Sequence, residues 1–123
     1  MAEGPVTKET GVRHMFAALR YSIQGISRLM EEQAFRHELM AFVGGLFILG
    51  VAGAEVSKFV GFIVLMLALF AAEALNTAIE ELVDRVSPEI SQVGKHAKDL
   101  GSFACFCLIL ANALYLVWAV LIG

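Results

Sequence analysis

Charged side chains are scarce in this sequence and unevenly distributed. Only 17% of the 123 residues are Asp, Glu, Lys or Arg, whereas 59% are hydrophobic, which lies outside the usual range for a soluble domain. Almost all ionisable groups lie in the segment up to Glu38, close to Glu55, or between Glu73 and Asp99. This segregation argues against a soluble domain and predicts an integral membrane protein.

Cysteine and proline are also rare, with two residues of each. Cys105 and Cys107 are two positions apart, about 200° around a helix, so we expect neither a disulfide nor a metal site between them. They are predicted to be core or lipid-facing residues. One proline falls in a polar leader over residues 1–10, which lacks the apolar stretch of a secretory signal, so no cleavage is expected.

The sequence contains none of the glycine-rich motifs that cradle phosphate in soluble nucleotide-binding proteins. It has no Gly-x-x-x-x-Gly-Lys-Ser/Thr, no Gly-x-Gly-x-x-Gly and no protein-kinase signature. Gly44 and Gly45 lie inside an apolar stretch, where small residues favour close helix packing. Any ATP site must therefore be built in another way.

Residues 11–31 carry apolar side chains at alternating steps of four and three, with arginine and other polar residues between them. This periodicity predicts an amphipathic helix. A basic helix of this kind beside membrane spans is typical of one that lies in the headgroup layer. The alternative is a soluble helix packed on something else. The apolar positions are Val12, Phe16, Leu19, Ile23, Ile26 and Met30.

Three apolar stretches predict transmembrane helices over residues 34–54, 57–84 and 97–122. Each can cross about 30 Å of hydrocarbon at about 1.5 Å per residue. A short link at Glu55 makes the first two a hairpin, and the second link, which contains Pro88, is polar. Eight of the nine Lys and Arg residues fall in the N-terminal region or the second link. The positive-inside rule places both in the cytoplasm.

Polar residues cluster on one face of the second predicted span. At about 100° per residue, four of them share a face about 80° wide. Glu73 lies about 9 Å inside the cytoplasmic boundary, where a carboxylate costs several kcal/mol unless it is paired, hydrated or protonated. We interpret Glu73 as a functional residue. The alternatives are a hydrogen bond in helix packing or an interfacial position that helix tilt allows. For Asp84 or Glu81 alone, an ordinary solvated helix end is the competing interpretation. The four are Glu73, Asn76, Glu80 and Asp84.

Two further polar clusters face the same membrane boundary. Carboxylates with water and phosphate oxygens form the shell that Mg²⁺ prefers, and lysines neutralise phosphate. His37 is interpreted as an interfacial hydrogen-bonding residue, because one histidine does not make a transition-metal site. The clusters are Glu31, Glu32, Arg36, His37 and Glu38, and Lys95, Lys98, Asp99 and Ser102.

Three segments resemble the signatures of the bacterial integral-membrane diacylglycerol kinases. They are Glu32-Gln-Ala-Phe-Arg-His-Glu38, Glu73-Ala-Leu-Asn-Thr-Ala-Ile-Glu80-Glu-Leu-Val-Asp-Arg85 and Ala97-Lys-Asp-Leu-Gly-Ser102. The resemblance implies a homotrimer in the bacterial inner membrane, each subunit a single all-α domain over residues 1–123 with a surface helix and three spans. It implies conversion of diacylglycerol to phosphatidic acid with ATP and Mg²⁺ at a cytoplasmic site, and no nucleic-acid partner.

The resemblance also implies roles for individual residues. Glu73 is similar to the catalytic base and Asn76 to a second catalytic-site residue, while Glu32 and Glu80 are similar to Mg²⁺ ligands. Positions similar to nucleotide contacts are Arg13, Tyr21, Glu32, Glu80, Glu89, Ser91, Lys98 and Asp99. Positions similar to lipid-substrate contacts are Ala34, Phe35, Arg36, Glu38, Glu73 and Ser102.

Two alternative functions remain open at this point. Related small kinases act on undecaprenol, and no residue excludes that long polyprenyl alcohol. A small oligomeric channel or transporter, with Glu73 and Asn76 along an ion path, is the alternative from another class. Against the channel, the polar face is confined to the cytoplasmic half of the second span, and only Asn112 offers a polar partner at depth on the third.

Overall fold

The computed structural model describes residues 10–89 and 91–123, which form four helices. They are α1 (Gly11–Leu29), α2 (Gln33–Val51), α3 (Val56–Val86) and α4 (Gln92–Leu121). The predicted leader, apart from Thr10, lies outside the described residues.

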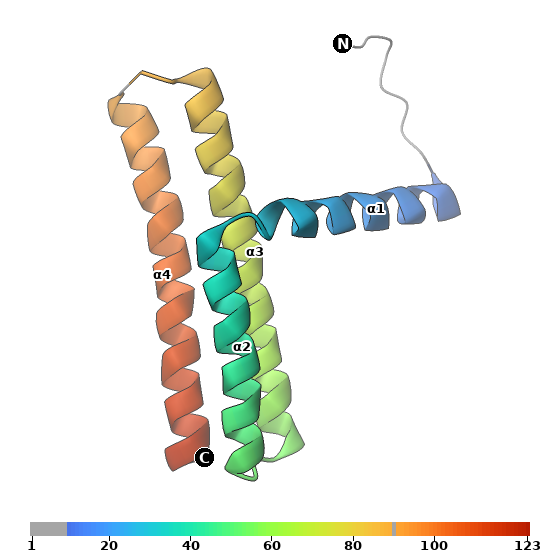
Figure 1. Cartoon of the computed structure of the whole chain (residues 1–123), viewed down its shortest axis with the longest axis vertical. Coiled ribbons are helices and arrows are strands. Elements are labelled where there is room, and N and C mark those ends of the chain that lie inside the picture. Colours follow the sequence, from blue (N-terminus) through green and yellow to red (C-terminus); the bar gives the residue numbers. More distant parts are fainter. Residues whose placement is uncertain (1–9, 90) are drawn as a thin grey trace.

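The three long apolar helices lie side by side, and α1 runs out crosswise from them (Figure 1). Each of α2, α3 and α4 is long and apolar enough to cross a membrane. Most large apolar side chains of α1 are exposed, including Phe16 and Leu19, whereas Leu29 at its end is buried. A crosswise helix with an uncovered apolar face suits the surface of the bilayer that the other three cross. The structure confirms the predicted all-α membrane fold with an N-terminal amphipathic helix.

Two helix ends differ most from the predicted boundaries, and each does so for a local reason. α2 ends at Val51, and Gly53 follows in the left-handed region with φ of 67°, which residues with a side chain rarely adopt. α4 begins several residues earlier than predicted, at Gln92. The Ser91 hydroxyl caps it by accepting a hydrogen bond from the backbone N–H of Gly94 at 3.0 Å.

α3 is too long for the bilayer alone. Its 31 residues rise about 46 Å, whereas the hydrocarbon core is about 30 Å thick. α3 and the beginning of α4 therefore extend past the level of α1 (Figure 1). The polar end of this helix pair stands clear of the hydrocarbon on the side where α1 lies.

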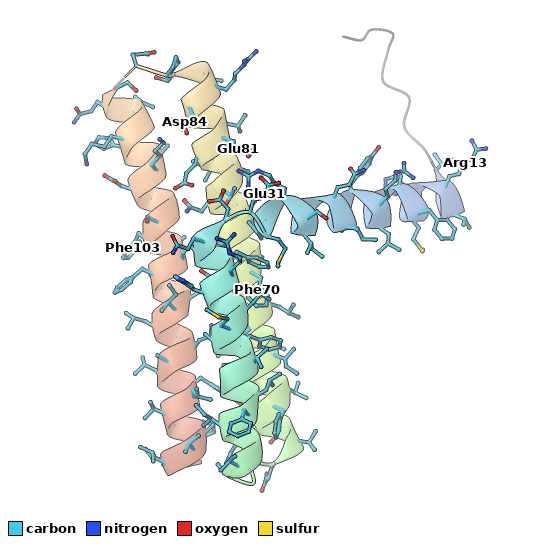
Figure 2. All side chains as sticks on the ribbon, in the orientation of Figure 1. Arg13, Glu31, Phe70, Glu81, Asp84 and Phe103 are labelled. Carbon is cyan, nitrogen blue, oxygen red and sulfur yellow. The ribbon has the colours of Figure 1, made fainter. Side chains whose placement is uncertain are left out.

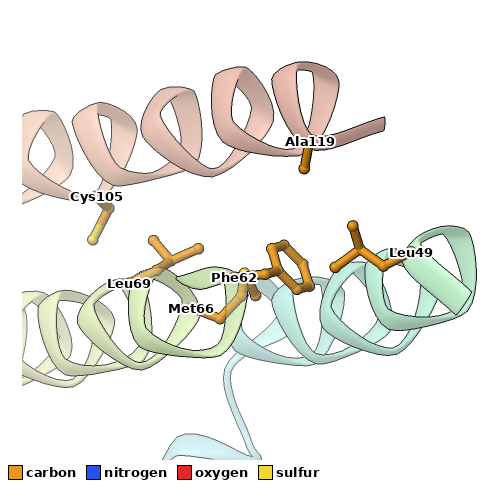
Figure 3. Packing of buried hydrophobic residues seen from close by; sticks show 6 residues of the cluster. All are labelled: Leu49, Phe62, Met66, Leu69, Cys105 and Ala119. Atoms are coloured by element: carbon orange, nitrogen blue, oxygen red, sulfur yellow. The ribbon is translucent and has the colours of Figure 1, made fainter. Parts of the chain in front are cut away.

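The spanning helices enclose a small apolar core between them (Figure 3). Two polar side chains of α4 also tie it to α3. The Asn112 amide donates to the carbonyl of Leu65 at 3.1 Å, and the Tyr115 hydroxyl donates to the backbone of α3 at the same distance. Such bonds help to fix which residues of two helices face each other in lipid. The core residues are Leu49, Phe62, Met66, Leu69, Cys105 and Ala119.

Gly45 allows α2 to approach α3 closely. A Cβ atom at this position would overlap the ring of Phe62, which is 2% exposed and enclosed by the core. A Cβ on the preceding Gly44 would meet nothing within contact distance. The two glycines therefore differ, and only Gly45 is needed for this close approach.

We expect Gly45→Ala to lower the free energy of unfolding in detergent micelles by about 1–3 kcal/mol, because the added methyl group overpacks the core against Phe62. Gly44→Ala is the matched control and should leave stability unchanged or slightly raised. Denaturant titration followed by circular dichroism measures both. Equal stability of the two variants would contradict this expectation and show that the ring of Phe62 moves aside for the added methyl group.

Candidate active site

The packing of α4 against α3 arranges polar groups in order of depth. Asn112 lies deepest and bonds to the α3 backbone. Nearer the surface, Asn76 occupies the space where Gly101 lacks a side chain. Beyond it, the Lys98 ammonium pairs with the Asp84 carboxylate at 2.6 Å, in a half-exposed position. The interface therefore runs from a buried amide to an accessible ion pair.

Glu73 and Asn76 lie buried together in the middle of this series, 6% and 8% exposed. They share one face of α3, as their spacing predicts. α2 contributes Glu38, whose carboxyl group is within hydrogen-bonding reach of the Glu73 carboxyl. α4 contributes the thiol of Cys105, which is also within reach of Glu73. All three spanning helices thus contribute polar groups around the predicted base.

Several polar atoms in this layer have no protein partner. Among the described residues, Glu38 Oε1, Asn76 Oδ1, Thr77 Oγ1 and, deeper in the bundle, Asn112 Oδ1 are buried without a hydrogen bond. Buried polar atoms in folded proteins are nearly always paired. The three open atoms near Glu73 are therefore candidates for contact with a ligand.

A cavity of about 490 Å³ opens beside Glu38 and is lined by all three spanning helices. Its walls are mainly apolar, with Ala41 from α2, Met66 from α3 and Leu116 from α4. His37 and Glu38 supply polar groups at its α2 side. The cavity is therefore an apolar space that begins next to the buried carboxylates.

A second cavity, of about 240 Å³, lies at the water-exposed end of α3 and α4. Three of the predicted nucleotide contacts, Glu89, Ser91 and Lys98, line it together. The Ser87 hydroxyl holds this link in shape, since it donates to Glu89 at 3.0 Å and lies 3.1 Å from the Ser91 hydroxyl. The structure thus brings these three residues to one place.

Arg28 joins the surface helix to α3. Its guanidinium donates to Glu81 at 2.8 Å and to Glu32 at 3.0 Å, and Glu31 lies 3.9 Å away. Figure 2 shows Glu31 and Glu81 at this junction. These hydrogen bonds raise the pKa of Arg28 above its ordinary value, and the bond to Glu32 has a larger effect than the bond to Glu81. Glu32 is thereby held close to the polar end of α3.

Other predicted contacts are not brought together within one chain. Arg13 lies at the far end of α1 (Figure 2), and Tyr21 is exposed along the same helix. Ser102 is exposed on α4, while Asp99 pairs with Lys95 at 2.7 Å. A single chain therefore brings together only some of the predicted nucleotide and lipid contacts.

The predicted lipid contacts at the start of α2 also point in different directions. Phe35 is buried and packs edge-on against Phe70, with ring centroids 5.2 Å apart. Ala34 lines the larger cavity. Arg36 is exposed and donates to the carbonyl of Met30 at 2.8 Å, which steadies the turn between α1 and α2.

Glu32 and Glu80 are the carboxylates that the resemblance assigns to Mg²⁺. Among residues 10–89 and 91–123, no three His, Cys, Asp or Glu side chains are grouped as a complete metal cage. Mg²⁺ in phosphoryl-transfer sites is usually held by one or two carboxylates together with phosphate and water. Glu32 and Glu80, both half-buried near the polar end of α3, fit that smaller requirement.

This chain is similar in sequence to a known family of membrane enzymes. The family described as prokaryotic diacylglycerol kinase matches residues 20–122. The chain belongs to the prokaryotic diacylglycerol kinase family. A diacylglycerol kinase of Sinorhizobium sp is 56% identical over 96% of this chain and 86% of its own length. The diacylglycerol kinase of Haemophilus influenzae is 35% identical over 83% of this chain and 90% of its own length. That of Escherichia coli (strain K12) is 30% identical over 92% of this chain and 92% of its own length.

Membership of the diacylglycerol kinase family confirms the resemblance carried by the three sequence segments and the prediction of an enzyme. Together with the three apolar helices, it confirms a multi-pass membrane protein. The predicted roles of individual residues stay predictions.

Three residues of this site were missed by the sequence analysis. The spacing of Arg28 and Glu32 is a typical helical ion-pair spacing and could have indicated that pair. Nothing in the sequence indicates that Arg28 also reaches α3. Cys105 was expected to be a core or lipid-facing residue, and it is buried, but its contact with Glu73 depends on how α4 packs. Thr77 shows no sequence signal of its own.

Proposed function

We propose that this protein phosphorylates the hydroxyl group of 1,2-diacylglycerol with ATP and Mg²⁺, and so forms phosphatidic acid in phospholipid metabolism. The observation that carries the proposal is the order of groups along α3: the buried carboxylate of Glu73 lies at membrane depth, and a cavity lined by Lys98 lies toward water. The relatives named diacylglycerol kinase support the same substrate.

Glu73 is the proposed general base. The apolar cavity beside Glu38 offers space for an acyl chain, which supports a lipid hydroxyl held at the level of the buried carboxylates. As the hydroxyl oxygen attacks the γ-phosphorus, its proton passes to Glu73 and the bond to ADP breaks. Asn76, one turn closer to water, orients the reacting groups with its amide.

The nucleotide is proposed to bind at the water-exposed end of α3 and α4. Lys98 supplies an ammonium that neutralises phosphate charge, and Asp84 steadies its position. Glu89 and Ser91 line the same cavity and offer hydrogen-bonding groups for the nucleoside. The rise from Glu73 to the level of Glu80 is about 10 Å, which a triphosphate can bridge.

Glu32 and Glu80 are the proposed Mg²⁺ ligands. When bound, Mg²⁺ neutralises charge on the transferring phosphoryl group. Arg28 keeps Glu32 in place from the surface-helix side, while Glu80 is presented by α3 itself. The ligands thus come from both sides of the junction between α1 and the bundle.

The active site is proposed to face the cytoplasm from the bacterial inner membrane. Eight of the nine Lys and Arg residues belong to the N-terminal region and to the link between α3 and α4. ATP is available on that side. The lipid from the bilayer and ATP from water then reach the same end of α3.

We further propose a homotrimer in which subunits share active sites. Arg13 is too far along α1 to join Lys98 in one chain (Figure 2). A groove between α3 and α4 is lined by Asn76 beside Ala97 and Gly101. Small residues allow another helix to approach closely in lipid. A neighbouring α1 or α2 seated there would complete the nucleotide site.

The direct test of the kinase proposal is an assay of the purified protein in mixed micelles with MgATP. We expect phosphate transfer to diacylglycerol, with undecaprenol as the competing acceptor. Preferred phosphorylation of undecaprenol would reassign the lipid. Ion conductance without ATP consumption would instead support a channel.

Glu73→Gln should lower kcat by a factor of about 10² or more, the scale of lost general-base catalysis, while the protein still inserts and binds MgATP. Glu31→Gln removes an exposed carboxylate at the same membrane boundary and serves as the control. Near-normal turnover of the Glu73 variant would mean that another group accepts the proton.

Glu80→Gln and Glu32→Gln should each raise the Mg²⁺ concentration needed for half-maximal activity, because a hard-cation site loses one charged oxygen ligand. Glu81→Gln also loosens Arg28 but removes no proposed ligand, so it separates metal binding from the ion pair. Glu55→Gln is a second control, because Glu55 lies on the opposite membrane face. An equal change in the Mg²⁺ requirement of all four variants would mean that Mg²⁺ binds elsewhere.

Two inactive variants, Glu73→Gln and Asp99→Asn, should regain partial activity when they are co-refolded as one mixed oligomer. If a site takes Glu73 from one subunit and Asp99 from another, some mixed sites receive both intact residues. The gain should stay well below wild type, since intact sites are a minority. Tagged mixed oligomers as inactive as their parents would show that both residues serve one site from a single chain.

A further inference from the structure

Glu38 and Glu73 form a carboxyl pair that the proposed reaction does not explain. They come from α2 and α3, are 8% and 6% exposed, and have their carboxyl groups within hydrogen-bonding reach. Among residues 10–89 and 91–123, neither carboxyl takes part in an ion pair. Two negative charges at this separation and burial repel each other strongly.

Hydrogen bonding leads to the same difficulty. Ionised carboxylates only accept hydrogen bonds, so two of them in contact have no donor between them. Glu38 Oε1 is indeed buried without a partner. A single proton between the pair would supply the donor and remove one of the two charges. Carboxyl pairs that share one proton arise in enzymes for this reason.

We propose that Glu38 carries one proton in the resting protein and donates it in a hydrogen bond to Glu73, which stays ionised as the base. Glu38 is then a positioning residue, because it acts through Glu73. This role rests on the proposed kinase function and is distinct from the lipid contact expected of Glu38 by resemblance.

The proton balance of the reaction is simple. The lipid hydroxyl oxygen forms a bond to the γ-phosphorus of ATP, and ADP leaves with the electrons of the broken P–O bond. The hydroxyl proton moves to Glu73, so the pair holds two protons. One proton then leaves to water, which restores the singly protonated pair.

Other titratable groups surround the pair, and each needs a control. The thiol of Cys105 is within reach of Glu73, and His37 lines the same cavity as Glu38. Glu80 lies two turns toward water on α3, and the nearest described cation on α1, Arg28, is engaged by Glu32 and Glu81. Cys105→Ala and His37→Gln are therefore measured beside the Glu38 variants, to show whether either group contributes to the acid limb.

The first measurement is the pH dependence of kcat/KM for the full-length protein in bilayers. The acid limb of this profile is the loss of kcat/KM toward low pH. In Glu38→Gln, the amide replaces the protonated carboxyl as donor, so the acid limb should lie at the same pH as in wild type. In Glu38→Leu, the donor is lost and ionisation of Glu73 is disfavoured. The acid limb should then move to higher pH by about one unit or more.

Two outcomes of this measurement would overturn the proposal. If Glu38 is ionised in the resting protein, Glu38→Gln removes a neighbouring negative charge and moves the acid limb to lower pH. If Glu38 only contacts lipid, both variants raise KM and leave the acid limb in place. Glu31→Gln, which removes an exposed carboxylate, is the control and should leave the acid limb in place.

The second measurement is infrared absorption of the protonated carboxylic C=O group at neutral pH. Wild type, Glu31→Gln and His37→Gln should show this band, and Glu38→Gln should lose it. A band that survives in Glu38→Gln, or that is missing in wild type, would contradict the proposal. Because no turnover is needed, this measurement remains decisive even if the kinase assignment fails.

Discussion

The antiparallel contact between α3 and α4 sets the depth of each polar group in this protein. Helices in lipid satisfy their own backbone groups, so only side chains can fix how two of them align. Asn112 bonds to the α3 backbone, and Asn76 fits against the missing side chain of Gly101. At the water-exposed end, Lys98 meets Asp84. A shift of one helical turn would break all three contacts together, so this alignment also sets the depth of the proposed catalytic residues.

The length of α3 then gives the protein two environments on one helix. Its lower part lies in hydrocarbon, and its last turns extend past the level of α1 into water (Figure 1). We propose that a lipid hydroxyl reaches the helix near Glu73 and that a nucleotide reaches it beyond Glu80. One rigid element would then hold both substrates at a fixed separation without a phosphate-binding glycine loop.

The buried polar layer departs from what stability alone would favour. Glu38, Glu73 and Asn76 are enclosed by the bundle, and two of them carry buried atoms without a protein partner. Such groups cost stability unless protons or ligands satisfy them. The core around Phe62 and the interhelical bond of Asn112 offset that cost in the lower half of the bundle. Departures of this kind are expected at functional sites.

The sequence by itself determined the spans, the surface helix and the polar face of α3. These features depend on hydrophobic length and helical periodicity within one segment, and both can be read locally. The tertiary structure decided the rest: that Glu38 meets Glu73, that Arg28 bridges Glu32 to Glu81, and that Arg13 lies far from the link. Contacts between helices depend on the crossing direction and the alignment of the two helices. Small residues such as Gly101 permit a close approach, but their presence in the sequence does not predict which helix approaches them.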